Sequence, residues 1–231
     1  MVEDGAVKVK GVPTPKVATL VARDTAIDVV QPGHGYVGRG ALKLEGALDA
    51  FDVVVPGKRV LDAGASTGGF TDLLLQRGAI EVVALDVGYG QLADRLRTDP
   101  RVRVMDRTNL RHVTPAETGG RFELLVADLS FISLCTVAPA LAALAEDGGD
   151  LIVLVKPQFE AGRPDVGSGG IVRDDDVRRR AVDSVIDCLA GVGLGAQATA
   201  PSPVSGAGGN REVFLWCRSG SPAATGRDMP I

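Results

Sequence analysis

From about Leu61 onward, short apolar runs rich in β-branched residues alternate with amphipathic stretches. Such runs predict strands, and the stretches between them predict crossover helices, so we expect βαβ units and a parallel sheet. Seven strands are predicted: Arg59–Ala63, Glu81–Asp86, Val102–Met105, Leu124–Asp128, Asp150–Lys156, Ala196–Ala200 and Glu212–Cys217. The expected fold class is therefore α/β, Rossmann-like, with a seven-stranded doubly wound sheet.

Four amphipathic stretches predict helices. They are Gly69–Arg77, Gly90–Leu96, Leu134–Ala145 and Asp174–Gly191. The last stretch begins with three consecutive acids, which interact favourably with the N-terminal end of a helix dipole.

The two ends of the chain differ from this pattern. "GAVKVKG" and "TAIDVV" predict two short strands in residues 1–30, too little chain to bury a core alone. We expect a linker at residues 31–37, the main domain at 38–218, and a disordered tail at 219–231, where small and polar residues dominate.

Composition limits the possible classes of protein. A chain of 231 residues suits one substantial domain with a small appendage. Acids outnumber bases 29 to 25, which argues against a surface wholly devoted to nucleic acid but permits a local basic patch. The longest apolar runs, such as "LIVLV", are too short to span a bilayer, and no signal-peptide pattern begins the chain.

The cysteines and histidines form no recognisable motif. Cys135, Cys188 and Cys217 are scattered, odd in number and unpaired by spacing, and there are only two histidines. We therefore expect no metal site, and we expect a reducing, cytoplasmic setting.

A glycine-rich bend follows the first predicted strand of the sheet, in "VLDAGASTGGFTD". Its spacing, D-x-G-x-x-x-G-G, differs from the G-x-G-x-x-G of dinucleotide sites and resembles the first motif of S-adenosylmethionine-dependent methyltransferases. Glycines let backbone and ligand approach closely, the next helix favours an anionic group, and an acid ending the second strand can accept ribose hydroxyls. The expected cofactor residues are Asp62, Gly64, Ser66, Gly68, Gly69, Phe70, Asp86 and Asp106. A tight turn without a ligand is the alternative.

Asp106 belongs to this set only by its place after the third strand, in "MDRTN". Methyltransferases of this kind reach the adenine there. A solvated turn acid is the competing interpretation, and Asn109 is a weaker candidate for the same role.

The acceptor of the methyl group is predicted by exclusion. "LLVADLSFIS" lacks the Pro-Pro motif of enzymes that methylate exocyclic amines, and no cysteine has the Pro-Cys context of cytosine-C5 enzymes. An oxygen target remains. A ribose 2′-hydroxyl must be deprotonated or steered, which a lysine amine can do and an arginine cannot. Lys43 and Lys156 are the candidates.

Four residues then carry a family resemblance. Lys43, Asp128, Lys156 and Glu212 match, in order and context, the K-D-K-E tetrad of FtsJ-like ribose 2′-O-methyltransferases. Phrases such as "DVGYGQL", "LVKPQFE" and "GNREVFLW" resemble the TlyA family over nearly the whole chain. The resemblance implies that Lys156 is the base or steering group, with S-adenosylmethionine as cofactor and a cytidine of ribosomal RNA as substrate.

Each tetrad residue also has an ordinary structural interpretation. Lys43 is compatible with a helix surface and Lys156 with a strand end that extends to water. Glu212 could pair with Arg211 or Arg218. The loop "FEAGRPDVGSGG" after Lys156 suits either a mobile flap or a plain surface loop.

Members of the TlyA family begin with an S4-like RNA-binding module. Met1–Val30 resembles only its strand-rich second half, with Lys8, Lys10 and Lys16 as remnants of a basic face. We expect such a partial module to bind RNA weakly, and a version extended upstream to bind more tightly with a steeper salt dependence.

Two functions from other classes compete with methylation. A haemolysin-type membrane-active protein is opposed by the short apolar runs, and a catalytically silent RNA-binding assembly protein is opposed by the intact tetrad.

Overall fold

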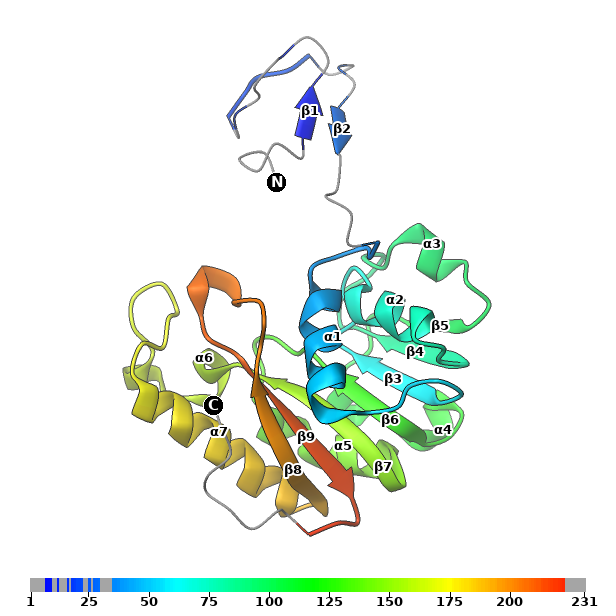
Figure 1. Cartoon of the computed structure of the whole chain (residues 1–231), viewed down its shortest axis with the longest axis vertical. Helices are drawn as coiled ribbons and strands as arrows, with labels where there is room; N and C mark the ends of the chain where they lie inside the picture. The colour runs from blue at the N-terminus through cyan, green and yellow to red at the C-terminus, as the bar shows by residue number, and fades with distance from the viewer. Residues whose placement is uncertain are drawn as a thin grey trace. The chain divides into compact units, whose positions relative to one another are not determined.

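A computed structural model describes residues 7–9, 12, 16, 18–22, 25, 27–29 and 35–222. The chain divides into two compact units, Met1–Tyr36 and Val37–Ile231 (Figure 1). In the first unit, β1 (Val7–Val9) pairs antiparallel with β2 (Ile27–Val29), which confirms both short strands. Lys10, residues 31–34 of the expected linker and residues 223–231 of the expected tail lie outside the described residues. The S4-like character of this unit stays a prediction.

The second unit is built on one sheet with the strand order β5-β4-β3-β6-β7-β9-β8. Its strands are β3 (Arg59–Ala63), β4 (Glu81–Leu85), β5 (Val102–Met105), β6 (Phe122–Ala127), β7 (Ala145–Val155), β8 (Leu194–Pro201) and β9 (Val213–Ser219). The seven predicted strands are all present. The sheet is mixed, however, because β9 runs antiparallel to both β7 and β8. β8 and β9 are joined by a loop without a crossover helix, and only an antiparallel pair permits this.

Seven α-helices and three short 3₁₀ turns connect the strands within the described residues. They are α1 (Gly40–Phe51), α2 (Gly69–Gln76), α3 (Asp94–Arg97), α4 (Pro115–Thr118), α5 (Leu134–Leu144), α6 (Pro157–Glu160) and α7 (Asp175–Ala190), with η1 (Leu110–His112), η2 (Arg163–Asp165) and η3 (Ala207–Gly209). The sequence-based assignment lacked α1, although its buried residues recur at helical spacing: Ala41, Leu44, Ala47, Leu48 and Phe51. α3 is shorter than expected, because the segment before it forms a loop.

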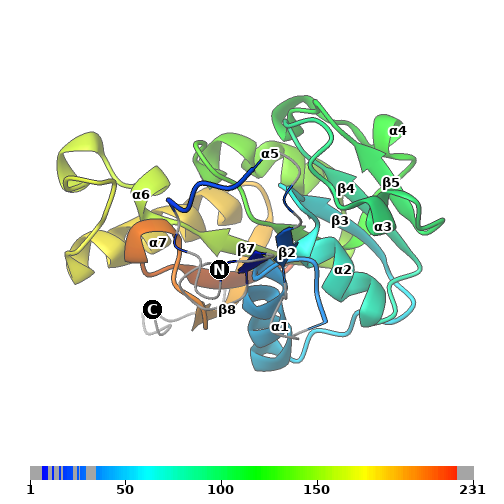
Figure 2. The same ribbon diagram turned by 90° about the horizontal axis from the view of Figure 1, so that it is seen from above.

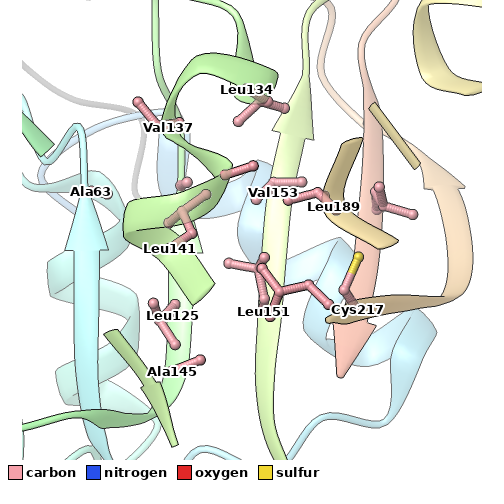
Figure 3. Packing of buried hydrophobic residues seen from close by; sticks show 14 of the residues in the cluster. Ala63, Leu125, Leu134, Val137, Leu141, Ala145, Leu151, Val153, Leu189 and Cys217 are labelled. Carbon is pink, nitrogen blue, oxygen red and sulfur yellow. The ribbon is translucent and has the colours of Figure 1, made fainter. Parts of the chain in front are cut away.

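Helices cover both faces of the sheet. α1 and α2 pack together on one face, and α5 and α7 on the other (Figures 1 and 2). Since side chains alternate along a strand, odd-numbered positions such as Leu125 and Val153 meet Leu141 of α5, as Figure 3 shows. Even-numbered positions face α1 and α2, where the ring of Phe214 lies 6.4 Å from that of Phe70. This burial on both faces explains the continuous apolar runs.

The order of the strands also marks where a ligand would bind. From β3 the chain proceeds to β4 and β5 on one side, whereas β6 starts the other side. Ligands of open α/β sheets bind beyond the carboxyl ends of the strands at such a reversal. Gly64 follows β3 and Asp128 follows β6, so the glycine bend and one tetrad residue meet there.

Candidate functional site

The glycine bend is shaped by neighbouring parts of the chain. Gly64 has φ +87°, and a Cβ atom there would lie 2.5 Å from the carbonyl oxygen of Asp128. Gly68 has φ +98°, and a Cβ atom there would collide with Leu96 of α3. The expected reason for these glycines, room for a ligand, is therefore incomplete. At Gly68 the positive φ favours glycine and leucine side chains pack close to the backbone, whereas Gly64 also lines the cavities described below.

Asp62 lies inside the protein, under the bend. Its side chain is fully buried and accepts a hydrogen bond of 2.6 Å from the hydroxyl of Thr71. Burial raises the pKa of the Asp62 carboxyl to about 7, and the nearby carboxylates of Asp128 and Asp86 add to the effect. Asp62 lines none of the cavities at the site, so its position suits support of the bend better than contact with a ligand.

We expect Asp62→Asn to change how stability depends on pH. A carboxyl whose pKa rises on folding stabilises the folded state at low pH, and this contribution is lost as the pH rises from about 4 through about 7. An amide does not titrate. The free energy of unfolding of the wild type minus that of the variant should therefore fall by about 1–3 kcal/mol between about pH 5 and pH 8. Urea denaturation measures the difference, and a constant value would contradict the burial effect.

A cavity of about 530 Å³ lies beyond the ends of β3, β4 and β6. Apolar side chains form most of its wall: Leu85, Val87, Leu110, Ile132 and Val137. Asp86 lies at its edge and accepts hydrogen bonds from the backbone N–H groups of Ser66 (2.8 Å, to Oδ2) and Gly88 (2.7 Å, to Oδ1). Each carboxylate oxygen can accept a second hydrogen bond, so Asp86 retains capacity for a ligand with two hydroxyls.

Asp106 is held by the protein itself. Its Oδ2 accepts hydrogen bonds from the backbone N–H of Gly90 at 3.0 Å and from the guanidinium of Arg97 at 3.1 Å. The bond from Gly90 and the charge and hydrogen bond of Arg97 hold the Asp106 pKa below its usual value. Asn109 lines the cavity and Asp106 does not, so the geometry favours the candidate that the sequence ranked lower.

A second cavity, of about 670 Å³, adjoins the first. Gly64, Ser66 and Asp128 line both, so the two cavities form one continuous site. Gly69 and Phe70 of α2 line the second cavity, as do Lys43 of α1 and the loop before β9. Most expected cofactor residues therefore meet one tetrad acid at a single edge of the sheet.

The tetrad residues form two ion pairs. Lys156 Nζ lies 2.7 Å from Asp128 Oδ1 and donates a hydrogen bond of 2.8 Å to the hydroxyl of Ser130. Lys43 Nζ lies 2.6 Å from Glu212 Oε2, and the Glu212 side chain is almost completely buried. The expected structural alternative for Glu212, a pair with Arg211 or Arg218, is wrong. A buried carboxylate requires a close cation, and α1 supplies Lys43.

The sequence-based set lacked several residues at this site, among them Ser130 and Phe131. Phe131 is 91% exposed, lines the first cavity and has φ +64°, which is rare for a bulky residue. Its ring lies 5.2 Å from that of Phe159. Ser130 and Phe131 belong to "DLSFIS", in which the sequence analysis singled out only Asp128. No local pattern distinguishes an exposed phenylalanine from a buried one.

Two of the cysteines are paired, which corrects the sequence-based expectation. Cys135 in α5 and Cys188 in α7 form a disulfide across 53 positions of the sequence. Spacing could not indicate this, because the two residues meet only when α5 and α7 pack side by side. The cysteine content therefore gives no support for a reducing setting. Cys217 is free and buried, and burial raises the pKa of its thiol to about 12.

Two further features are absent from the described residues. No helix there is both long and apolar enough to cross a membrane. Over the same ranges, no group of three or more His, Cys, Asp or Glu side chains is arranged to hold a metal ion.

Comparison with known proteins agrees with the resemblance noted in the sequence. The FtsJ-like methyltransferase model matches residues 36–219. The 16S/23S rRNA (cytidine-2'-O)-methyltransferase TlyA of Mycobacterium tuberculosis (strain CDC 1551 / Oshkosh) is 53% identical over 216 residues, 93% of this chain and 81% of that protein. Hemolysin A of Brachyspira hyodysenteriae is 40% identical, over 91% of this chain and 88% of that protein.

A solved structure agrees with these relatives. "Putative hemolysin from Streptococcus thermophilus" superposes with a TM-score of 0.82 at 41% identity, covering 88% of this chain and 74% of that one. The resemblance seen in the sequence is thereby confirmed, and the chain belongs to the FtsJ-like methyltransferase family, among proteins similar to TlyA.

Proposed function

We propose that this protein transfers a methyl group from S-adenosylmethionine to the 2′-hydroxyl of a cytidine in ribosomal RNA. One observation carries the proposal: the Lys156–Asp128 and Lys43–Glu212 ion pairs lie at the end of the sheet where the glycine bend forms a continuous two-part cavity. The TlyA relative, which is 53% identical, bears the name of this reaction. A ribosomal substrate implies a cytoplasmic site of action.

The residues present fit the cofactor. The fold is that of S-adenosylmethionine-dependent methyltransferases, and the bound cofactor supplies an electrophilic methyl group. The apolar wall of the first cavity suits an adenine ring, while Asp86 suits the ribose hydroxyls. Gly64 and Gly69 line the second cavity, where the methionine part would lie beside Asp128.

The tetrad then acts on the acceptor hydroxyl. Lys156 directly follows β7, which pairs with β6, and Asp128 with Ser130 fixes the direction of its amine. In its neutral form this amine can accept the proton of the hydroxyl. In the charged form that pairs with Asp128 it cannot take a proton, but it can orient the hydroxyl so that an oxygen lone pair points toward the methyl carbon. Lys43 neutralises Glu212 and leaves its second carboxylate oxygen to orient the ribose.

Asp86→Ala should weaken binding of S-adenosylmethionine by about 1–3 kcal/mol, because the ribose hydroxyls lose their acceptors in a partly enclosed site. Titration calorimetry measures the loss. Asp106→Asn is the matched control, since Asp106 lies in the loop directly after β5, the strand beside β4, but does not line the cavity. An equal loss in both variants, or none at Asp86, would contradict the assignment.

Phe131→Ala should raise the KM for RNA by roughly 5- to 50-fold, because an exposed ring at the mouth of the cavity offers a stacking surface for a base. Phe131→Tyr retains the ring and should restore most of the affinity. Binding of S-adenosylmethionine to both variants provides the control for folding. A KM unchanged in the alanine variant would show that Phe131 does not contact the substrate.

A single experiment tests the function as a whole. Ribosomal RNA from cells with and without the gene is mapped for 2′-O-methyl groups, and the purified protein is assayed on RNA that lacks the mark. We expect methylation of a cytidine that depends on S-adenosylmethionine. Leakage of liposomes without methylation would favour a membrane-active protein, and binding of RNA and cofactor without turnover would favour a silent assembly protein.

A further inference from the structure

Two arginines flank the Lys43–Glu212 ion pair. Arg39 has helical angles (φ −62°, ψ −19°) and precedes Lys43 by four residues, so both side chains project from the same side of α1. Arg211 immediately precedes Glu212 in the chain. Both arginines are exposed, and within residues 35–222 neither guanidinium has an ion pair or hydrogen bond.

Many other arginines of this unit are neutralised by an acid. Arg95 pairs with Asp72, and Arg218 pairs with Asp150. The contrast matters because a guanidinium already held by a carboxylate must lose that partner before it can bind another anion. Arg39 needs no such exchange.

The two arginines line adjoining cavities. Arg39 lines the second cavity together with Lys43. Arg211 lines a third cavity of about 650 Å³, which also contains Glu212. Ser205 borders both of these cavities, so the two cavities adjoin, with Lys43 in the wall of one and Glu212 in the wall of the other.

The third cavity has a wall of mixed charge, in which three arginines lie among Asp175, Asp176 and Glu212. Arg178, Arg179 and Arg211 line it, and the charge of Arg211, after burial, lowers the pKa of Arg178. Of the two aspartates in the same wall, Asp175 is paired with Arg178. The other acids of the wall are Asp176, at the start of α7, and Glu212, which is paired with Lys43.

The backbone that carries Arg211 is fixed in place. Asn210 is buried, its Oδ1 accepts a hydrogen bond of 3.0 Å from the N–H of Val172, and its Nδ2 donates one of 2.9 Å to the carbonyl of Gly170. These bonds join the loop after Lys156 to the loop before β9. The loop before β9 is therefore held in place at Asn210, so the backbone that carries Arg211 is preorganised.

We propose that Arg39 and Arg211 bind the backbone phosphates on either side of the target nucleotide, so that the RNA strand crosses the Lys43–Glu212 pair. This inference rests on the proposed ribose methylation. The 2′-hydroxyl and the 3′-phosphate are carried by neighbouring carbons of one ribose, so a site that acts on the hydroxyl must accommodate phosphates beside it. Guanidinium groups bind phosphate oxygens in pairs, and such contacts position a strand without reading its sequence.

Arg39→Gln and Arg211→Gln in the full chain test the inference. Each variant should bind unmodified 16S and 23S rRNA roughly 5- to 20-fold more weakly, with the slope of log affinity against log salt reduced by about 0.7. Arg180→Gln is the matched control, because Arg180 is exposed on α7 but lines none of the three cavities. Its affinity and salt slope should equal those of the wild type.

The kinetic constants of the variants distinguish a phosphate contact from a structural role of the arginines. In both glutamine variants the KM for RNA should rise while kcat and the affinity for S-adenosylmethionine stay within about threefold of the wild type. An unchanged salt slope, or an effect no larger than that of Arg180→Gln, would overturn the inference. If the wild type methylates no RNA but the two arginines still set the salt slope, the proposed reaction fails while the phosphate site stands.

Discussion

Lys156→Ala should abolish methyl transfer while cofactor affinity and folding stay close to those of the wild type. The amine of Lys156 is positioned by Asp128 and Ser130 at 2.7 and 2.8 Å, and alanine removes the group that we propose accepts or directs the hydroxyl proton. Loss of a positioned general base lowers a rate by about 10²–10⁴-fold. Single-turnover methylation of RNA measures the rate, and titration calorimetry with S-adenosylmethionine provides the folding control.

Lys156→Arg separates the two possible roles of this residue. A guanidinium keeps the positive charge and can pair with Asp128, but it cannot give up its proton. We expect the arginine variant to be nearly as inactive as the alanine variant. If it keeps most of the wild-type rate, Lys156 acts as a fixed charge that steers the hydroxyl, and its assignment as the base is wrong.

Reduction of the Cys135–Cys188 disulfide should lower the free energy of unfolding by about 2–4 kcal/mol. The disulfide closes a loop of 53 residues, and in the chain-entropy account its loss returns conformational freedom to the unfolded state. Urea denaturation with and without dithiothreitol measures the change. Cys135→Ser should have the same lower stability in both conditions, and wild-type protein that is insensitive to the reductant would contradict the prediction.

The same disulfide also holds a helix that lies next to the first cavity. Cys135 is the second residue of α5, a helix that begins directly after the segment carrying Ser130 and Phe131. The Glu160 carboxylate accepts a hydrogen bond from the N–H of Leu134 at the start of this helix, and burial raises the pKa of Glu160. The start of α5 is therefore held both by a hydrogen bond and by a covalent link to α7.

Patterns that are local in the sequence determined most of the fold. Apolar runs of strand length, separated by amphipathic stretches, predicted all seven strands of the sheet. The glycine bend and Asp86 could be placed at the ligand edge, because parallel strands connected by helices bring their carboxyl ends to one side. The residue types of the tetrad were also recognisable, since each has a distinctive sequence context.

Only the tertiary structure decided which groups meet. Lys43 and Glu212 are 169 positions apart, and Cys135 and Cys188 lie on separate helices, so neither pair leaves a trace in local spacing. The antiparallel direction of β9 depends on its neighbours in the sheet rather than on its own residues. Hydrophobic periodicity and turn-forming residues act over a few positions of the chain. The partners of a side chain, its burial and its pKa depend instead on how distant elements pack.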